Sequence, residues 1–149
     1  MFQIRIHGRG GQGVVTAADL LAYAAFKEDR HAQAFPSFGS ERTGAPVVSY
    51  CRIDTKPIRS HEPVLTPDAV IVQDPTLLSA IDVFAGLRPG GYAIINSAKP
   101  FSAFDIDPAT VADESDADGS AGAPTAGPGD GVVRVTQASA GHGFLAEGL

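Results

Sequence analysis

Apolar and polar side chains alternate at the start of the chain. Phe2, Ile4 and Ile6 fall on one side of an alternation that runs through residues 2–7. This period of two predicts a β-strand with one apolar face. Central strands of a doubly wound sheet are usually apolar on both faces, so we expect the polar face of this strand to contact a ligand, a loop or a partner.

The rest of the first hundred residues divides into further apolar segments. Between residues 13 and 27, apolar residues recur at the i, i+3, i+4 spacing of an amphipathic helix. The pattern also predicts a second helix over 76–87 and short strands over 31–35, 47–53, 69–72 and 92–96. This order of elements predicts an α/β protein, a three-layer α/β/α fold with a mainly parallel or mixed sheet and a Rossmann-like start. Cys51 falls within a predicted strand, and we expect it in the core.

The composition changes after residue 111. The segment 112–131 consists mainly of Ala, Gly, Pro and Asp and has no aromatic or large aliphatic side chain. Such a segment buries too little apolar surface to offset the entropy lost on ordering. The sequence therefore predicts an α/β domain over 1–111 and a low-complexity acidic tail over 112–149, disordered apart from one short strand near 132–135.

Most of the net negative charge lies in this tail. Residues 1–111 hold ten basic and eleven acidic side chains, whereas 112–149 hold one and six. Nucleic-acid binding needs a basic face, so we expect no nucleic-acid partner. No apolar run approaches the roughly 20 residues that cross a bilayer, and the start of the chain lacks a secretory signal pattern, so we expect no membrane association. The single cysteine excludes an internal disulfide and a four-cysteine iron–sulfur cluster, and it fits a reducing cytoplasm.

The first strand leads into a glycine-rich loop, HGRGGQGVV, that opens the first helix. Glycine tolerates positive φ, so successive N–H groups of such a loop can point into one concavity, where the helix N-terminus also attracts phosphate. The loop matches the dinucleotide pattern Gly8-x-Gly10-x-x-Gly13, but the nicotinamide version also requires an acidic residue at the end of the second strand. Residues 33–35 supply none, so the sequence disfavours NAD. Two interpretations remain: an anion-binding loop, or glycines that only allow close packing of strand on helix.

Four segments carry a resemblance to a known family. They are HGRGGQGVVTAADLLAYAAF, QAFPSFGSERTGAPVVSYCRI, PDAVIVQDPTLL and LRPGGYAIINS, in unbroken order over about residues 2–100. Together they resemble the gamma subunit of pyruvate:ferredoxin oxidoreductase, in the 2-oxoacid:ferredoxin oxidoreductase family (the pyruvate/ketoisovalerate oxidoreductase catalytic domain).

The resemblance implies one subunit of a larger oxidoreductase. In such enzymes alpha and beta subunits hold thiamine diphosphate, which attacks the 2-oxoacid and releases CO2. Electrons pass through iron–sulfur clusters on partner subunits, including a ferredoxin-like delta subunit, to ferredoxin, and coenzyme A takes the acyl group. The resemblance assigns the gamma chain a part in coenzyme A binding and assembly, with no catalytic residue and no metal site of its own.

The resemblance also indicates binding residues beyond the glycine loop. The family's E-R-x-G signature falls on Glu41 and Arg42, where Arg42 is expected to contact a phosphate or a substrate carboxylate while Glu41 orients it. Asn96 ends a strand at the carboxyl edge of the sheet, where ligands of open α/β sheets bind. The expected cofactor-binding residues are therefore Gly8, Arg9, Gly10, Gly11, Gln12, Gly13, Glu41, Arg42 and Asn96. His7 is expected to brace the loop through a ring hydrogen bond, with a catalytic base as the alternative.

The end of the chain departs from the family pattern. Family members are expected to continue with a further helix, a Pro-Asn-Thr-like segment and a closing helical stretch, which residues 112–149 do not contain. Two alternatives to the subunit hypothesis therefore stay open. One is a stand-alone module that binds coenzyme A or a nucleotide, and the other is a truncated remnant without function.

Overall fold

The computed structural model describes residues 1–37, 43–97, 99, 103–104 and 134–138. Within these ranges the chain forms six strands, one α-helix and one 3₁₀ helix. In chain order they are β1 (Phe2–Arg9), α1 (Val14–Lys27), β2 (His31–Pro36), β3 (Pro46–Asp54), β4 (Ala69–Val72), η1 (Pro75–Ser79), β5 (Tyr92–Asn96) and β6 (Arg134–Ala138).

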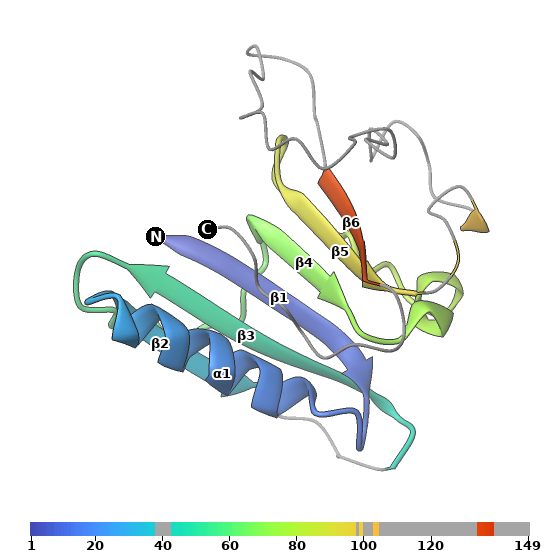
Figure 1. The fold of residues 1–149 in the computed structure, drawn as a ribbon, viewed down its shortest axis with the longest axis horizontal. Helices are drawn as coiled ribbons and strands as arrows, with labels where there is room; N and C mark the ends of the chain where they lie inside the picture. Colours follow the sequence, from blue (N-terminus) through green and yellow to red (C-terminus); the bar gives the residue numbers. More distant parts are fainter. Residues whose placement is uncertain (38–42, 98, 100–102, 105–133, 139–149) are drawn as a thin grey trace.

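The strands form one mixed sheet in the order β2-β3-β1-β4-β5-β6. The strands β1, β4, β5 and β6 are parallel, and Figure 1 shows β1 and β4 running toward the same end of the sheet. The hairpin strands β2 and β3 add an antiparallel half, because β3 pairs antiparallel with both β1 and β2. The predicted α/β fold with a mixed sheet is confirmed. Strand β6 lies close to the strand expected near 132–135, while the rest of the tail, and with it the expected disorder, lies outside the described residues.

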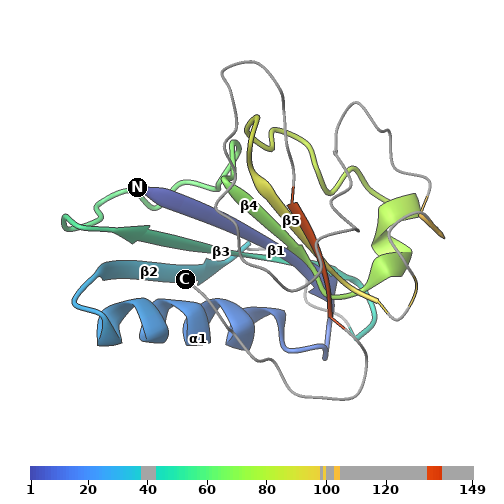
Figure 2. The same ribbon diagram turned by 45° about the horizontal axis from the view of Figure 1, so that its top comes forward.

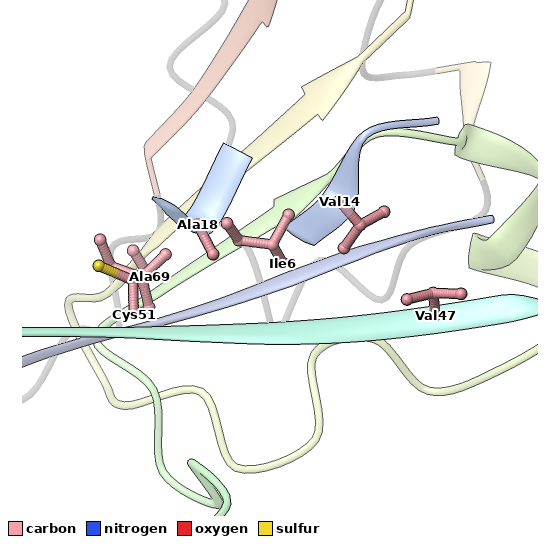
Figure 3. Close-up of a cluster of buried hydrophobic side chains, with 7 residues drawn as sticks. Ile6, Val14, Ala18, Val47, Cys51 and Ala69 are labelled. Carbon is pink, nitrogen blue, oxygen red and sulfur yellow. The ribbon is translucent and has the colours of Figure 1, made fainter. Parts of the chain in front are cut away.

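Helix α1 covers one face of the sheet, over β1, β2 and β3 (Figure 2). Figure 3 shows its Val14 and Ala18 packing against Ile6 of β1, with Cys51 of β3 in the same cluster. Cys51 is fully buried, as predicted. Burial, with a smaller effect from the charge of Asp19, raises the pKa of its thiol to about 11.

The segment after β4 covers the opposite face, over β4 and β5. Leu77 and Val83 are buried there against Val70, Val72 and Ile95. The helix predicted over 76–87 is wrong, since the structure forms only the short 3₁₀ helix η1 followed by turns.

A buried arginine binds the second half of this segment. The guanidinium of Arg5 donates hydrogen bonds to the carbonyl oxygens of Val64, Val83 and Ala85. Carbonyls that turn toward a side chain in the sheet do not continue an intrahelical bond pattern. Gly86, with a φ of 74°, then bends the chain back toward β5.

The polar face of β1 therefore contacts a loop, one of the three possibilities that its alternation left open. Arg5 and His7 are only 8% and 5% exposed, so both faces of the strand are buried. On the neighbouring strand, Arg52 is buried in the same way and bonds the carbonyl oxygens of Ser60 and Glu62. These two arginines fasten the segment between β3 and β4 to the sheet.

Candidate functional site

The loop between β1 and α1 is shaped by its glycines. Gly11 has a φ of 90°, and Gly13, the N-cap of α1, has a φ of 76°. Other residues adopt this left-handed region at a cost of about 1–2 kcal/mol. Gly8 is needed for another reason, because a Cβ there would overlap the Cγ2 methyl of Val14. Gly8 therefore serves close packing, as the second interpretation of the glycines holds, whereas Gly11 and Gly13 set the course of the loop. Anion binding by the loop stays a prediction.

A surface hollow of about 220 Å³ lies between this loop and the first turn of α1. It is lined by Arg9, Gly10, Gly11, Gly13, Val14, Val15, Thr16 and Val47. The first hydrogen bond of the helix runs from the N–H of Ala17 to the carbonyl of Gly13, so the N–H groups of residues 14–16 precede it. N–H groups in this position, together with the helix dipole, favour an anion. The hollow is smaller than the roughly 300 Å³ of ordinary ligand pockets, so it suits one charged part of a ligand.

Part of the loop's own backbone is already bonded within the protein. The N–H of Gly10 donates to the carbonyl of Ala45 at 2.9 Å, and the N–H of Gln12 donates to the carbonyl of Arg9 at 3.0 Å. The N–H of Arg9 donates to Oε1 of Gln12 at 2.7 Å. Three of the N–H groups that the sequence offered as ligand donors therefore hold the loop in shape.

The side chain of Arg9 joins the loop to two other segments. Its Nε lies 3.3 Å from Oδ2 of Asp74, and its Nη2 donates to Oγ1 of Thr76 at 3.1 Å. Its Nη1 donates to the carbonyl of Gly44 at 3.1 Å. The side chain of Arg9 is 30% exposed, so it reaches solvent while its charge is paired.

Asp74, directly after β4, accepts hydrogen bonds from both sides. Its Oδ1 accepts from the N–H and Oγ1 of Thr76, which caps η1, and its Oδ2 accepts from Nε2 of Gln12 at 2.9 Å. These bonds, led by those from Thr76 and Gln12, lower the pKa of the Asp74 carboxyl. Neither Asp74 nor Thr76 was among the binding residues that the sequence predicted. Their position at the carboxyl end of a parallel strand, the criterion that selected Asn96, was the signal that could have identified them.

Of the predicted binding residues beyond the loop, the structure describes Asn96. Asn96 is exposed at the end of β5, and its Nδ2 donates to the carbonyl of Gln73 at 3.4 Å. Glu41 and Arg42 lie outside the described residues. The chain resumes at Thr43, which forms a parallel bridge with Gly10. The end of the E-R-x-G segment thus lies against the glycine loop.

His7 precedes the loop but does not brace it through a side-chain bond. Its Nε2 accepts a hydrogen bond from Nε of Arg5 at 3.0 Å, two residues back on the same strand. The predicted bond to the loop is therefore wrong in its partner. Burial, and next the neighbouring charge of Arg5, lowers the pKa of His7 to about 4, so the ring is neutral at pH 7.

Neither a metal centre nor a membrane segment is found in the described part of the chain. No group of three or more His, Cys, Asp or Glu side chains among these residues could hold a metal ion. None of the helices described is long and apolar enough to span a bilayer.

Comparison with known proteins points to one family. The family model for pyruvate ferredoxin/flavodoxin oxidoreductase matches residues 3–134. The chain is 59% identical over 99 residues to the pyruvate/ketoisovalerate oxidoreductases common subunit gamma of Thermococcus kodakarensis, which covers 66% of this chain and 54% of that protein. It is 48% identical over 111 residues to the pyruvate synthase subunit PorC of Methanothermobacter thermautotrophicus, covering 74% of this chain and 62% of that one.

A solved structure supports the same relationship. The crystal structure of the pyruvate oxidoreductase subunit PORC of Thermotoga maritima is 42% identical in sequence and superposes with a TM-score of 0.58. The match covers 68% of this chain and 53% of that one. This chain therefore spans about half the length of several of the relatives it matches.

Proposed function

The chain belongs to the pyruvate ferredoxin/flavodoxin oxidoreductase family, and from this premise we propose that it is the gamma subunit of a 2-oxoacid:ferredoxin oxidoreductase. The observation that carries the proposal is its high identity to proteins named as gamma and PorC subunits. Its partners are alpha and beta subunits that hold thiamine diphosphate, and a ferredoxin-like delta subunit that holds iron–sulfur clusters. The single cysteine suits a reducing cytoplasm, where we place the complex.

The proposed complex converts a 2-oxoacid, for which pyruvate is our first candidate, to an acyl-coenzyme A. The bond between the carboxylate and the carbonyl carbon breaks and CO2 leaves. The two electrons that remain reduce two ferredoxins, and the thiol sulfur of coenzyme A bonds to the acyl carbon and loses its proton. Thiamine diphosphate on the partner subunits supplies the carbanion chemistry. Residues of this chain take no part in the bond-breaking step.

We further propose that this chain contributes to coenzyme A binding at the glycine loop. The hollow between this loop and α1 has room for a charged part of the ligand, and the N–H groups of the first helical turn suit a pyrophosphate. Arg9 lines the hollow and would add a charge-assisted hydrogen bond from its partly exposed side chain. Arg42 and Asn96 remain candidates for further phosphate contacts.

Co-expression with the candidate partner subunits tests the subunit hypothesis. The chain should copurify with subunits that carry thiamine diphosphate and iron–sulfur clusters, and the complex should reduce ferredoxin only when a 2-oxoacid and coenzyme A are both present. A complex that lacks this chain yet keeps full activity would overturn the proposal.

Calorimetry with coenzyme A separates the subunit from a stand-alone binding module. We expect tight binding to the complex and weak binding to the isolated chain, because one small hollow encloses only part of the ligand. Arg9→Ala should weaken binding to the complex. Arg88→Ala is the matched control, since Arg88 also pairs with an aspartate, Asp68, but does not line the hollow. Micromolar binding to the isolated chain would favour the stand-alone module.

A further inference from the structure

Three segments far apart in the sequence meet around one guanidinium. The glycine loop supplies Arg9, the start of the β3 segment supplies the carbonyl of Gly44, and the turn after β4 supplies Asp74 and Thr76. Asp74 connects the members of this network, since it accepts hydrogen bonds from Gln12 and Thr76 and forms an ion pair with Arg9. The hydrogen bonds of the Arg9 Nε and Nη2 go to Oγ1 of Thr76. The proposed binding mode at the glycine loop does not itself use Asp74.

We propose that Asp74 is a positioning residue for coenzyme A binding: it fixes Arg9 and Gln12 so that the glycine loop keeps its shape around the hollow. This inference rests on the proposed function. Gln12 links Asp74 to the backbone of the loop, because its Nε2 donates a hydrogen bond to Asp74 while its Oε1 accepts one from the N–H of Arg9. Arg9 links Asp74 to the segment before β3, through its bond to the carbonyl of Gly44. One carboxylate thus acts on the glycine loop and, through Arg9, on this neighbouring segment.

Only an acceptor can serve at the Oδ2 position. Among the described residues, the side-chain groups that approach it are Nε of Arg9, as an ion-pair partner, and Nε2 of Gln12, as a hydrogen-bond donor. In Asp74→Asn one oxygen remains to accept the N–H of Thr76 and cap η1, but the amide nitrogen faces two donors. This variant therefore removes the support of the loop and keeps the local turn. Asp54→Asn is the matched control, because Asp54 also accepts a backbone N–H, from Thr55, and pairs with a cation at the far end of β1.

Charge and position predict opposite results for Asp74→Asn. If the carboxylate acted only through its charge, its removal would make the electrostatic potential at the hollow more positive. An anionic ligand would then bind more tightly at low salt. If it acts by positioning, the loop loses its fixed shape and the ligand binds more weakly. The sign of the change in affinity therefore distinguishes the two roles.

Amide hydrogen exchange of the full chain without ligand tests the positioning directly. We expect Asp74→Asn to speed exchange in residues 8–13 by roughly tenfold, because the loop loses the acceptor that holds Gln12 and the ion pair that holds Arg9. Asp54→Asn should leave these residues unchanged. Thr76→Val should speed exchange as well, whereas Thr76→Ser keeps the hydroxyl that bonds Arg9 and should restore protection. Unchanged exchange in Asp74→Asn would overturn the positioning role, whatever ligand the loop binds.

Steady-state kinetics of the assembled complex test its consequence for coenzyme A. We expect Asp74→Asn to raise the KM for coenzyme A roughly fivefold to tenfold with little change in kcat, because the interaction supports binding and not chemistry. An unchanged or lower KM in Asp74→Asn, while Arg9→Ala raises it, would overturn the proposal. A complex in which neither Asp74→Asn nor Arg9→Ala alters the KM, while exchange in the loop does change, would locate coenzyme A elsewhere and contradict the proposed function of the loop instead.

Discussion

The neutral, buried ring of His7 makes the stability of this fold sensitive to acid. His7 is 5% exposed, and its pKa falls from the usual 6.5 to about 4, first because of burial and second because of the charge of Arg5. The unfolded chain therefore takes up a proton near pH 6.5 that the folded chain refuses until about pH 4. The contribution to stability is complete above pH 6.5 and is lost as the pH falls toward 4. This difference in pKa between the folded and unfolded chain contributes about 3 kcal/mol to the free energy of unfolding, of which about 2.5 kcal/mol is lost between pH 7.5 and pH 4.5.

His7→Gln isolates this effect, since the amide oxygen of glutamine can accept the bond from Arg5 without titrating. Urea unfolding of the full chain, followed by far-ultraviolet circular dichroism at pH 7.5 and pH 4.5, gives the free energy of unfolding. We expect the acid-induced loss to be about 2.5 kcal/mol smaller in His7→Gln than in the parent, while His31→Gln, at an exposed position of β2, should behave as the parent does. An equal loss in parent and His7→Gln refutes the reasoning. So does a ring resonance of His7 that titrates near pH 6.5, a measurement that does not depend on how stable the variant is.

Three further predictions follow from the packing of the two sheet faces. Gly8→Ala should lower the free energy of unfolding by about 1–3 kcal/mol, because the new methyl group would overlap Val14. In a double-mutant cycle, adding Val14→Ala should recover part of this loss, whereas additive losses would contradict the overlap. Cys51 is buried and its pKa is raised to about 11, so at pH 8 it should resist a disulfide reagent in the native chain and react fully in urea. Rapid labelling of the native chain would contradict its place in the core. Arg5→Met should lower the free energy of unfolding by about 2–4 kcal/mol, because three carbonyl groups lose their hydrogen-bond donor. Limited proteolysis should then cut first within residues 60–87. Resistance there would show that apolar contacts alone hold the segment.

Local rules correctly predicted most of the fold. The alternation over 2–7, the helical spacing over 13–27 and the apolar run over 69–72 each lie within, or within one residue of, an observed element. They succeed because a strand or helix with one buried face needs a fixed spacing of apolar residues, which is visible in the sequence. The helix expected over 76–87 does not form, and the carbonyl groups of Val83 and Ala85 instead bond Arg5 of a distant strand, a contact that no local pattern reports.

The sequence by itself determined the family and the position of the glycine loop. Gly11 and Gly13 are required by their own backbone angles, which is a local property that a motif can carry. Only the tertiary structure decided what holds that loop. Gln12 and Asp74 are 62 residues apart and meet because β1 and β4 are parallel neighbours whose carboxyl ends lie at one edge of the sheet. Likewise, the sequence does not show which groups pair with Arg9, because its partners come from two distant segments that only sheet pairing brings together.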